Sequence, residues 1–426
     1  MSARPVHAVA PPAAARTAAW AIALTLTAIA ACGELADSTN DAVGDGTGAG
    51  GDDGTVANDS AHTDAADATA GPGTVEARDL GTFTTGQDGK SGTIDFDLPA
   101  GVTALTLTLK GPPDVELQIA ALERGSAVAL VPPAWIGISA DPGVCLGPCA
   151  NRVLAQPERA AFLFPNTPLV ALEAGPQRLR LFAFRRIKSG VSPVVAKVAV
   201  GLHLRYGPLH LGNDLAVNLI YTGAHGLTRD AAASDADFQA ALAEARKRLA
   251  VAGIVLNPVR HYEVDGKLGF IVTREGSDGD LAALFRAGEG LPAGVNVFFV
   301  DSIYATSGGG GPPGLDLMLG VAGGIPGEPD AAGTSRAGIA IAGERDDPVR
   351  LGRAIAHEIG HYLGLFHTTE APDGDGDAIA DPLPDTPQPA GDNLMHWSVS
   401  AQSIALSHEQ SQVLRRSPML RPMRRP

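Results

Sequence analysis

The chain has 426 residues, enough for two or three domains with hydrophobic cores of ordinary size. Gly and Pro are abundant, with 52 and 32 residues, whereas aromatic residues make up only 5%. A formal net charge of −15, without any basic stripe, argues against nucleic acid as a partner. Much of that charge lies in one N-terminal segment, so it says little about the surface of the folded part.

Residues 1–31 have the pattern of a signal peptide for export. Two arginines precede an apolar stretch over about residues 18–31, which is short for a bilayer span but suits a secretion signal. The stretch runs into Cys32 and Gly33 in a pattern that resembles a bacterial lipobox. This resemblance implies a lipidated Cys32 that anchors an outer-membrane or cell-surface lipoprotein to the membrane. The alternative is ordinary cleavage of a secreted protein, with Cys32 incidental.

Residues 32–77 consist mainly of Asp, Gly, Ala and Thr. Such a segment cannot bury enough apolar surface to offset its chain entropy, so we expect it to be disordered. Behind a lipidated Cys32, this linker would act as a tether between the membrane and the folded domains.

Residues 78–207 show a period of two, which is typical of strands. Alternating apolar residues include Ile94, Phe96 and Leu98, then Leu105, Leu107 and Leu109, and a further run over residues 198–204. Turn clusters separate the runs, and the pattern predicts a β-sandwich. The sequence does not say whether this domain is a propeptide, a binding module or a spacer.

Residues 208–426 alternate between strand and helix patterns. Strands are predicted at residues 215–221, 254–262, 268–273, 295–300, 317–322 and 337–342. Helices are predicted at residues 235–252, 281–287 and 407–416. A further helix is expected to begin after Asp347, a good N-cap, with Pro348 in its first position.

The most specific motif lies in that helix, where residues 357–367 read His-Glu-Ile-Gly-His-Tyr-Leu-Gly-Leu-Phe-His. His357 and His361 are four residues apart, so they share one helix face and can hold one metal ion together. Gly364 can end the helix and let the chain bring His367 back to the metal. Three neutral histidines leave a coordination position open for water, which is typical of a catalytic zinc site.

Glu358 follows the first ligand and points beside the metal rather than onto it. Water bound to zinc has a pKa of about 7, and Glu358 can accept its proton and pass it to a leaving amine. The residues therefore predict peptide-bond hydrolysis with Glu358 as general base. The alternatives are a structural zinc site and a chance run of histidines. A structural site normally has a fourth protein ligand, often Cys, and no Cys follows residue 149.

The H-E-x-x-H-x-x-G-x-x-H pattern resembles the metzincin zinc peptidases, and residues 393–397 look like their Met-turn, with Met395 under the metal. With Asp385-Thr386-Pro387 between them, these segments look most like the pappalysin (cytophagalysin-like) branch. The resemblance implies an α+β fold over residues 208–426, with a mixed sheet backed by helices and an active-site helix. It implies zinc as cofactor and a protein or peptide as substrate. One strand near residues 317–322 is expected to form the edge that pairs with extended substrate.

Two departures from the pappalysin pattern bear on activity. A Tyr usually stands two residues after the Met, but here the residue is Trp397, whose indole N–H can only donate. Stabilisation of the transition state by a Tyr hydroxyl is therefore in doubt, with His396 or Trp397 as substitutes, and the disulfide often found near the Met-turn is missing. The alternatives to an endopeptidase are an inactive, surface-binding lipoprotein and a hydrolase of non-peptide amides. The intact Glu358 favours an enzyme.

Four aspartates between His367 and Met395 form a candidate calcium site: Asp373, Asp375, Asp377 and Asp381. Alternation of Asp with Gly suits a tight, oxygen-rich loop around Ca²⁺, although the EF-hand positions are not filled. The pappalysin resemblance implies calcium close by and favours it over a solvated acidic turn.

Cys145 and Cys149 are the only other cysteines. In an exported protein, the default for such a pair is a disulfide that closes a small loop. The alternative is a latency switch in which one thiolate occupies the open position on zinc, as in some metzincin propeptides, although the surrounding residues match that switch poorly.

Overall fold

The computed structural model describes residues 73–124, 128–131, 151–187, 190–209, 212–273, 279–306, 315–329, 331–342, 347–369, 380–386, 391–400 and 402–423. They form a mixed α/β structure with several sheets and few helices. The predicted signal peptide, nearly all of the predicted linker, and Cys32, Cys145, Cys149, Asp373, Asp375 and Asp377 lie outside the described residues. None of the helices in the described ranges is long and apolar enough to cross a membrane.

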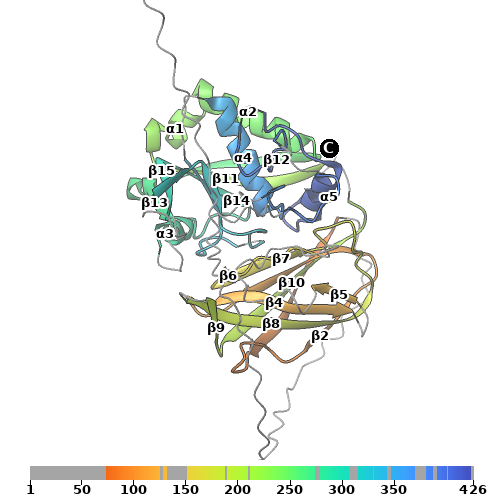
Figure 1. Cartoon of the computed structure of the whole chain (residues 1–426). Helices are drawn as coiled ribbons and strands as arrows, with labels where there is room; N and C mark the ends of the chain where they lie inside the picture. Colours follow the sequence, from red (N-terminus) through yellow and green to blue (C-terminus); the bar gives the residue numbers. More distant parts are fainter. Residues whose placement is uncertain are drawn as a thin grey trace, which may run out of the picture.

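Two antiparallel sheets form a sandwich in the lower half of Figure 1. One sheet has the order β1-β10-β3-β7 and the other β2-β8-β4-β5, with β6 beside β4 and β9 beside β8. The bounds are β1 Val75–Thr84, β2 Ile94–Leu98, β3 Val102–Lys110, β4 Glu116–Arg124, β5 Val128–Val131, β6 Gln156–Pro157, β7 Arg159–Phe164, β8 Gly175–Ile187, β9 Gly190–Pro193 and β10 Lys197–Tyr206. The alternating residues of β2, β3 and β10 pack between the sheets as their period of two predicts. Strand β1 begins at Val75, so the last residues of the predicted linker belong to the sandwich instead.

The second domain is built on a sheet with the order β12-β11-β14-β18-β17. Its first four strands are parallel, and β17 pairs antiparallel with β18 at one edge. The bounds are β11 Asn213–Tyr221, β12 Ile254–Glu263, β14 Val295–Val300, β17 Gly320–Ala322 and β18 Ile339–Ala342, and β19 Arg421–Pro422 pairs with the start of β11. A smaller sheet contains β13 Phe270–Thr273, β15 Ser302–Thr306 and β16 Leu315–Met318.

Helices cover both faces of the larger sheet. Their bounds are α1 Arg229–Ala232, α2 Ala236–Ala250, α3 Asp280–Arg286, α4 Pro348–Tyr362 and α5 His408–Arg416, with short 3-10 turns at Ala224–Gly226 and Gly266–Gly269. On one face, Val217 and Leu219 of β11 share a core with residues of α2 and α4. On the other face, Ile220 of β11 packs in a core with α3 and the smaller sheet. The sheet thus holds α4 against its side, and α4 carries the histidine motif.

Two predicted strands differ from the structure. The run at residues 317–322 is two strands, because β16 pairs with β15 in the smaller sheet whereas β17 pairs with β18 in the larger one. Gly320 lies at the change, where a residue without a side chain weakens a continuous strand. The run predicted to begin at residue 268 starts as a 3-10 turn, because Asp265 accepts a hydrogen bond from the Lys267 N–H, and becomes a strand only at Phe270.

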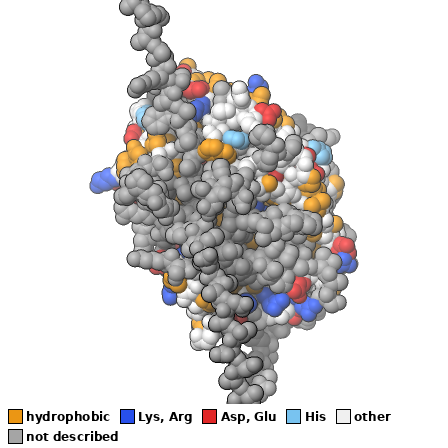
Figure 2. Space-filling view, viewed as in Figure 1, with side chains coloured by type: hydrophobic (Ala, Val, Ile, Leu, Met, Phe, Trp, Pro, Cys, Tyr) orange, Lys and Arg blue, Asp and Glu red, His pale blue; other side chains and the backbone are white. Residues whose placement is uncertain are grey.

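Side chains of different kinds are mixed on the face seen in Figure 2. Acidic and basic side chains lie among hydrophobic and polar ones over the described part of that face. The net charge of −15 is therefore not concentrated in one acidic field there.

Candidate metal centre

Helix α4 begins as the sequence predicts. The Asp347 side chain accepts a hydrogen bond from the Arg350 N–H, at 2.9 Å, and Pro348 occupies the first position. From Leu351 to Tyr362 every residue of the helix is buried. At Gly352, an added Cβ would lie 2.3 Å from the Ala241 carbonyl oxygen, so the glycine lets α4 approach the backbone of α2.

The end of α4 is fixed by the glycine that precedes the third histidine. Gly364 has a φ of +114°, a region that favours glycine. Its N–H donates to the His361 carbonyl, and the Leu365 N–H donates to the Gly360 carbonyl. These two bonds are the Schellman pattern, which satisfies the last carbonyls of a helix while the chain turns. The turn brings His367 back towards the histidines of α4.

Three buried histidines meet at this point and form a group that can hold a metal ion: His357, His361 and His367. The Nε2 atom of His367 lies 3.2 Å from Nε2 of His357 and 3.0 Å from Nε2 of His361. Zinc bonds of about 2.0–2.1 Å at tetrahedral angles place ligand nitrogens about 3.3 Å apart. The spacing of the imidazoles therefore suits a single metal ion between them.

Backbone carbonyls set the direction of two of these rings. Nδ1 of His357 lies 2.7 Å from the Leu394 carbonyl oxygen, and Nδ1 of His361 lies 2.7 Å from the Leu365 carbonyl oxygen. A carbonyl can only accept, so both Nδ1 atoms carry the proton and both Nε2 lone pairs point to the centre of the group. Burial, then the neighbouring His367 and His357, hold the pKa of His361 well below its ordinary value. Neutral imidazoles are the form that binds a metal.

Glu358 is the buried carboxylate beside this group. It is 3% exposed and follows His357 on α4. Its Oε2 atom has no hydrogen-bond partner among the described residues. Burial raises the pKa of Glu358 to about 8. A carboxylate buried without a partner is costly, and a bound cation or water beside it would supply the missing interaction. The residues present therefore fit a metal ion with a water molecule.

Met395 lies directly against the helix that carries the ligands. It is fully buried, and a Cβ added at Gly360 would lie 2.6 Å from its sulfur. The Met395 carbonyl accepts a hydrogen bond from the Thr368 N–H, next to the third histidine. Asn393 holds the loop, because its side-chain oxygen accepts from the Met395 N–H at 2.8 Å. The loop of Met395 thus contacts both α4 and the turn of His367.

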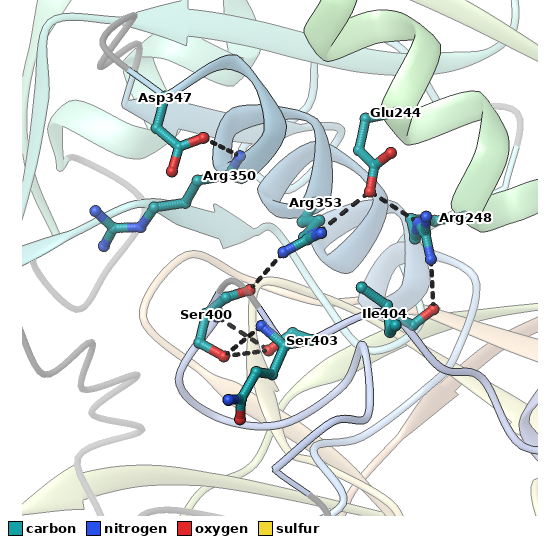
Figure 3. A network of polar contacts seen from close by, with 9 residues as sticks. Glu244, Arg248, Asp347, Arg350, Arg353, Ser400, Ser403 and Ile404 are labelled. Carbon is teal, nitrogen blue, oxygen red and sulfur yellow. Dashed lines mark hydrogen bonds and ion pairs between the residues drawn. The ribbon is translucent and has the colours of Figure 1, made fainter.

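A buried ionic network connects α4 to the chain beyond Met395 (Figure 3). Glu244 of α2 pairs with Arg248, at 2.9 Å, and with Arg353 of α4, at 3.2 Å. Arg353 donates to the Ser400 carbonyl and Arg248 donates to the Ile404 carbonyl. One carboxylate therefore fixes two arginines that hold the loop after Met395 against both helices.

Of the four candidate calcium ligands, only Asp381 lies in the described part of the chain. It is 7% exposed and accepts hydrogen bonds from the Thr386 hydroxyl and the Leu383 N–H. Its Oδ2 atom has no hydrogen-bond partner among the described residues. Burial raises the pKa of Asp381 to about 7. The neighbouring Asp385 has another role, because it accepts hydrogen bonds from the Ser407 hydroxyl and the Glu409 N–H at the start of α5.

Two residues near the metal centre carried no signal in the sequence. Gly320, at the start of β17, lies so close to Glu358 that an added Cβ would be 2.6–2.9 Å from three atoms of its side chain. The guanidinium carbon of Arg152, from the sandwich domain, lies 4.3 Å from the centre of the Phe366 ring, next to His367. The one feature that could have marked Arg152 is its position directly before an apolar run, Val153-Leu154-Ala155.

No protein-family model matches the sequence, and no curated protein matches it either. Among solved structures, metalloproteinase-II from Bacteroides fragilis aligns with 51% of this chain and 62% of its own, at 13% identity and a TM-score of 0.27. A family two carbohydrate esterase from Cellvibrio japonicus aligns with 54% of this chain and 67% of its own, at 8% identity and a TM-score of 0.15. This chain thus spans less than two thirds of the metalloproteinase. Neither likeness supports an argument about fold or function at these scores.

Proposed function

We propose that this chain is an exported zinc-dependent endopeptidase of the metzincin type, most similar to the pappalysin branch. One observation carries the proposal: the histidine group contains three ligands, with no fourth among the described residues, and Oε2 of the adjacent Glu358 has no hydrogen-bond partner among them. A structural zinc site is normally closed by a fourth protein ligand. An open position beside a buried carboxylate is the arrangement that hydrolysis requires.

Glu358 is the proposed general base. A zinc ion bound by the three histidines would polarise the attacking water and the substrate carbonyl. Glu358 then takes a proton from the water and delivers it to the leaving amine. A nearby cation favours the anionic carboxylate, so a bound metal ion would lower the pKa of Glu358 from about 8 towards the neutral pH range. A base whose pKa lies near the working pH transfers protons efficiently in both directions.

The edge of the larger sheet supports a peptide as the substrate. Strand β17 lies at that edge and pairs with β18 on its inner side. Its first residue, Gly320, lies against the Glu358 side chain. An extended peptide that added to this edge would therefore run past the proposed base. This geometry favours a peptide over a small amide, which would have no use for a strand edge.

Two side chains after Met395 are candidates to stabilise the transition state. Nδ1 of His396 lies 3.1 Å from the Ser398 carbonyl oxygen and 3.2 Å from the Ser398 N. The Trp397 ring lies beside it, with centroids 5.6 Å apart. Nδ1 of His396 is thus engaged by its own turn, which leaves its Nε2 atom and the indole N–H of Trp397 as the substitutes for a Tyr hydroxyl.

The cellular location and a calcium site are further parts of the proposal. We propose that lipidated Cys32 anchors the protein to an outer membrane or cell surface, with the acidic linker as tether. We propose that calcium binds in the loop that ends at Asp381, whose buried Oδ2 atom is available as one ligand. The predicted disulfide between Cys145 and Cys149 belongs to the same exported setting.

Cleavage of a denatured protein and a peptide library by the full chain tests the peptidase. The comparison includes wild type with and without a zinc chelator, Glu358→Gln, and Glu289→Gln as an exposed control. We expect Glu358→Gln to lose activity by about 10²–10⁴-fold while it keeps one zinc per chain. The control should match wild type.

The other outcomes separate the alternatives. One zinc per chain with no cleavage by wild type would favour an inactive, surface-binding lipoprotein. Hydrolysis of small amides without peptide cleavage would favour a different metallohydrolase. Cleavage that survives both the chelator and Glu358→Gln would contradict the proposed site.

A further inference from the structure

The sandwich domain and the second domain share a buried interface. Arg205 of β10 is 2% exposed, although it carries a charge. Its guanidinium donates to the Ser417 and Leu420 carbonyls beyond α5 and to the Asn213 side chain at the start of β11. Ala104 of β3 and Leu163 of β7 belong to the core of the second domain. Separation of the domains would expose these groups, so the sandwich is not a loosely attached spacer.

Ion pairs and hydrogen bonds surround this apolar contact. Arg159 of β7 pairs with Glu328, and its Nε atom donates to that carboxylate at 2.6 Å. Glu158 accepts a hydrogen bond from the Ser335 hydroxyl, also at 2.6 Å. Both partners lie in the segment between β17 and β18. The sandwich therefore contacts the chain that leads into the sheet as well as the C-terminal segment.

A second part of this interface lies under the turn that carries His367. A Cβ added at Gly364 would lie 2.8 Å from the Leu163 side chain. Phe366 packs in a cluster with Leu154 of the sandwich. The Arg152 guanidinium covers the Phe366 ring. Residues on both sides of the turn from Gly364 to Phe366 thus rest on the sandwich domain.

The backbone of Arg152 is held by Asn166. Its N–H donates to the Asn166 side-chain oxygen at 2.9 Å, and its carbonyl accepts from the Asn166 side-chain nitrogen at 2.6 Å. Arg152 is 2% exposed, and its positive charge acts on the Asp381 carboxylate. Asp381 is tied to the far side of the same turn, because its N–H donates to the Thr368 carbonyl. A buried cation thus faces Phe366, which precedes His367 in the chain, and acts on Asp381, which follows it.

We propose that the sandwich domain is part of the metal centre and that Arg152 is a positioning residue for the turn of His367. This inference rests on the proposed zinc site. His357 and His361 are aligned by α4, whereas His367 can reach the metal only if its turn is held. A planar guanidinium on an aromatic ring gives that turn an orientation that a flexible aliphatic chain cannot give.

The zinc dissociation constant of the full chain, measured by competition with a chromophoric chelator, tests the proposal. The variants are Arg152→Met, Arg152→Lys and the control Arg159→Met, which removes an ion pair of the same interface that includes no residue of the turn from Gly364 to His367. We expect Arg152→Met to weaken zinc binding by about 10–100-fold, the range for groups that orient metal ligands. Arg152→Lys should fall between, because it keeps the charge but loses the planar stack. Arg159→Met should stay within about twofold of wild type.

Cobalt substitution gives a readout that general destabilisation would not move. The visible bands of a Co²⁺-loaded chain report the ligand geometry, so they should change in Arg152→Met and not in Arg159→Met. Equal zinc affinities and equal spectra in the Met variants at positions 152 and 159 would overturn the role of Arg152. If Arg152→Met does not fold, the comparison of Arg152→Lys with the control Arg159→Met tests the role of Arg152 instead. A wild-type chain that binds no zinc would instead overturn the proposed function, and this inference with it.

Discussion

The ligands on α4 and the ligand on the following turn are held in different ways. His357 and His361 are four residues apart on a helix whose cap, first residue and end are local features of the sequence. His367 lies on a turn that rests on the loop of Met395 and on the sandwich domain. The spacing of the first pair is a property of one helix, whereas the placement of the third ligand depends on contacts from elsewhere in the fold.

This difference predicts where the metal centre should be sensitive to distant mutations. Changes that leave α4 intact can still displace His367, since the contacts of its turn come from Arg152, Leu163 and Met395. Glu358 lies on α4 with His357 and His361. Its side chain also lies against Gly320, in a strand from elsewhere in the chain, which limits its space. Some variants should disrupt the contacts that support the turn of His367. Others should affect only the residues that α4 carries.

The largest effect is expected at Glu244, whose two arginine partners connect α2 and α4 to the loop after Met395. Glu244→Gln removes the charge between Arg248 and Arg353, whose side chains are each only 10% exposed. Removing one partner of a buried ionic group costs about 3–5 kcal/mol, because the remaining charges stay buried. Urea unfolding should show this loss. The control, Glu123→Gln, breaks the more exposed pair with Arg180 and should cost less than about 1 kcal/mol. Equal losses in both variants would show that the network does not join the helices to the loop.

Much of helix α4 and of the sandwich strands could be predicted from the sequence. Asp347, Pro348 and Gly364 begin and end α4 as their conformational preferences require. The spacing of His357 and His361 follows from helix geometry alone. The period of two in β2 and β3 corresponds to their inward-facing residues. These features depend on neighbours within a few residues, which a sequence pattern contains.

The remaining features depend on contacts between distant segments. Nothing near Arg152 indicates that Phe366 lies under it, and nothing near Gly320 indicates Glu358. The run at residues 317–322 has one strand-like pattern but two partner strands, and partners are not encoded locally. The sequence therefore predicted the histidine group better than the contacts that support it.

The next effect concerns Glu358 itself. Gly320→Ala places a methyl group 2.6 Å from Glu358 Cγ and 2.7 Å from Oε1, so the buried carboxylate must move. We expect zinc binding to be unchanged and peptide cleavage to fall by about 100-fold, the cost of a displacement near 1 Å at a reacting group. Gly391→Ala is the matched control, because it is exposed and an added Cβ there meets no atom within 4 Å. Full activity of Gly320→Ala would argue against Glu358 as the base.

A pH-dependent effect is expected at Asp381, below the turn of His367. Burial raises its pKa from an ordinary value of 3.8 to about 7. Between these values the folded chain binds a proton that the unfolded chain has released, so stability falls as the pH rises from about 4 to about 7. The displacement corresponds to a ceiling of about 4 kcal/mol. Asp381→Asn should thus match wild type near pH 4 and be more stable by about 2 kcal/mol near pH 8.

Calcium distinguishes two roles of the same carboxylate. Thermal unfolding of wild type and Asp381→Asn, with and without millimolar Ca²⁺, gives the comparison. Stabilisation by calcium that disappears in the variant would show that Asp381 is a ligand. If Asp381→Asn changes the stability as predicted but calcium has no effect on wild type, Asp381 is a buried acid of the turn and not a calcium ligand. Asp95→Asn, an exposed control, should change stability by less than about 0.5 kcal/mol at either pH.

The smallest effect tests how far the support of His367 extends. Ser407 caps α5 by accepting from the Gln410 N–H, and the Gln410 side chain bonds to Asn393, which holds Met395. Ser407→Ala should lower the free energy of unfolding by about 1 kcal/mol. Ser234→Ala, next to the true cap Asp235, should change it by less than about 0.5 kcal/mol. If zinc affinity also falls in Ser407→Ala but not in Ser234→Ala, the hydrogen-bond chain from α5 through Asn393 supports the third ligand. An unchanged zinc affinity would show that the contacts that support His367 do not extend beyond Met395. The sandwich domain would then be the main support of His367.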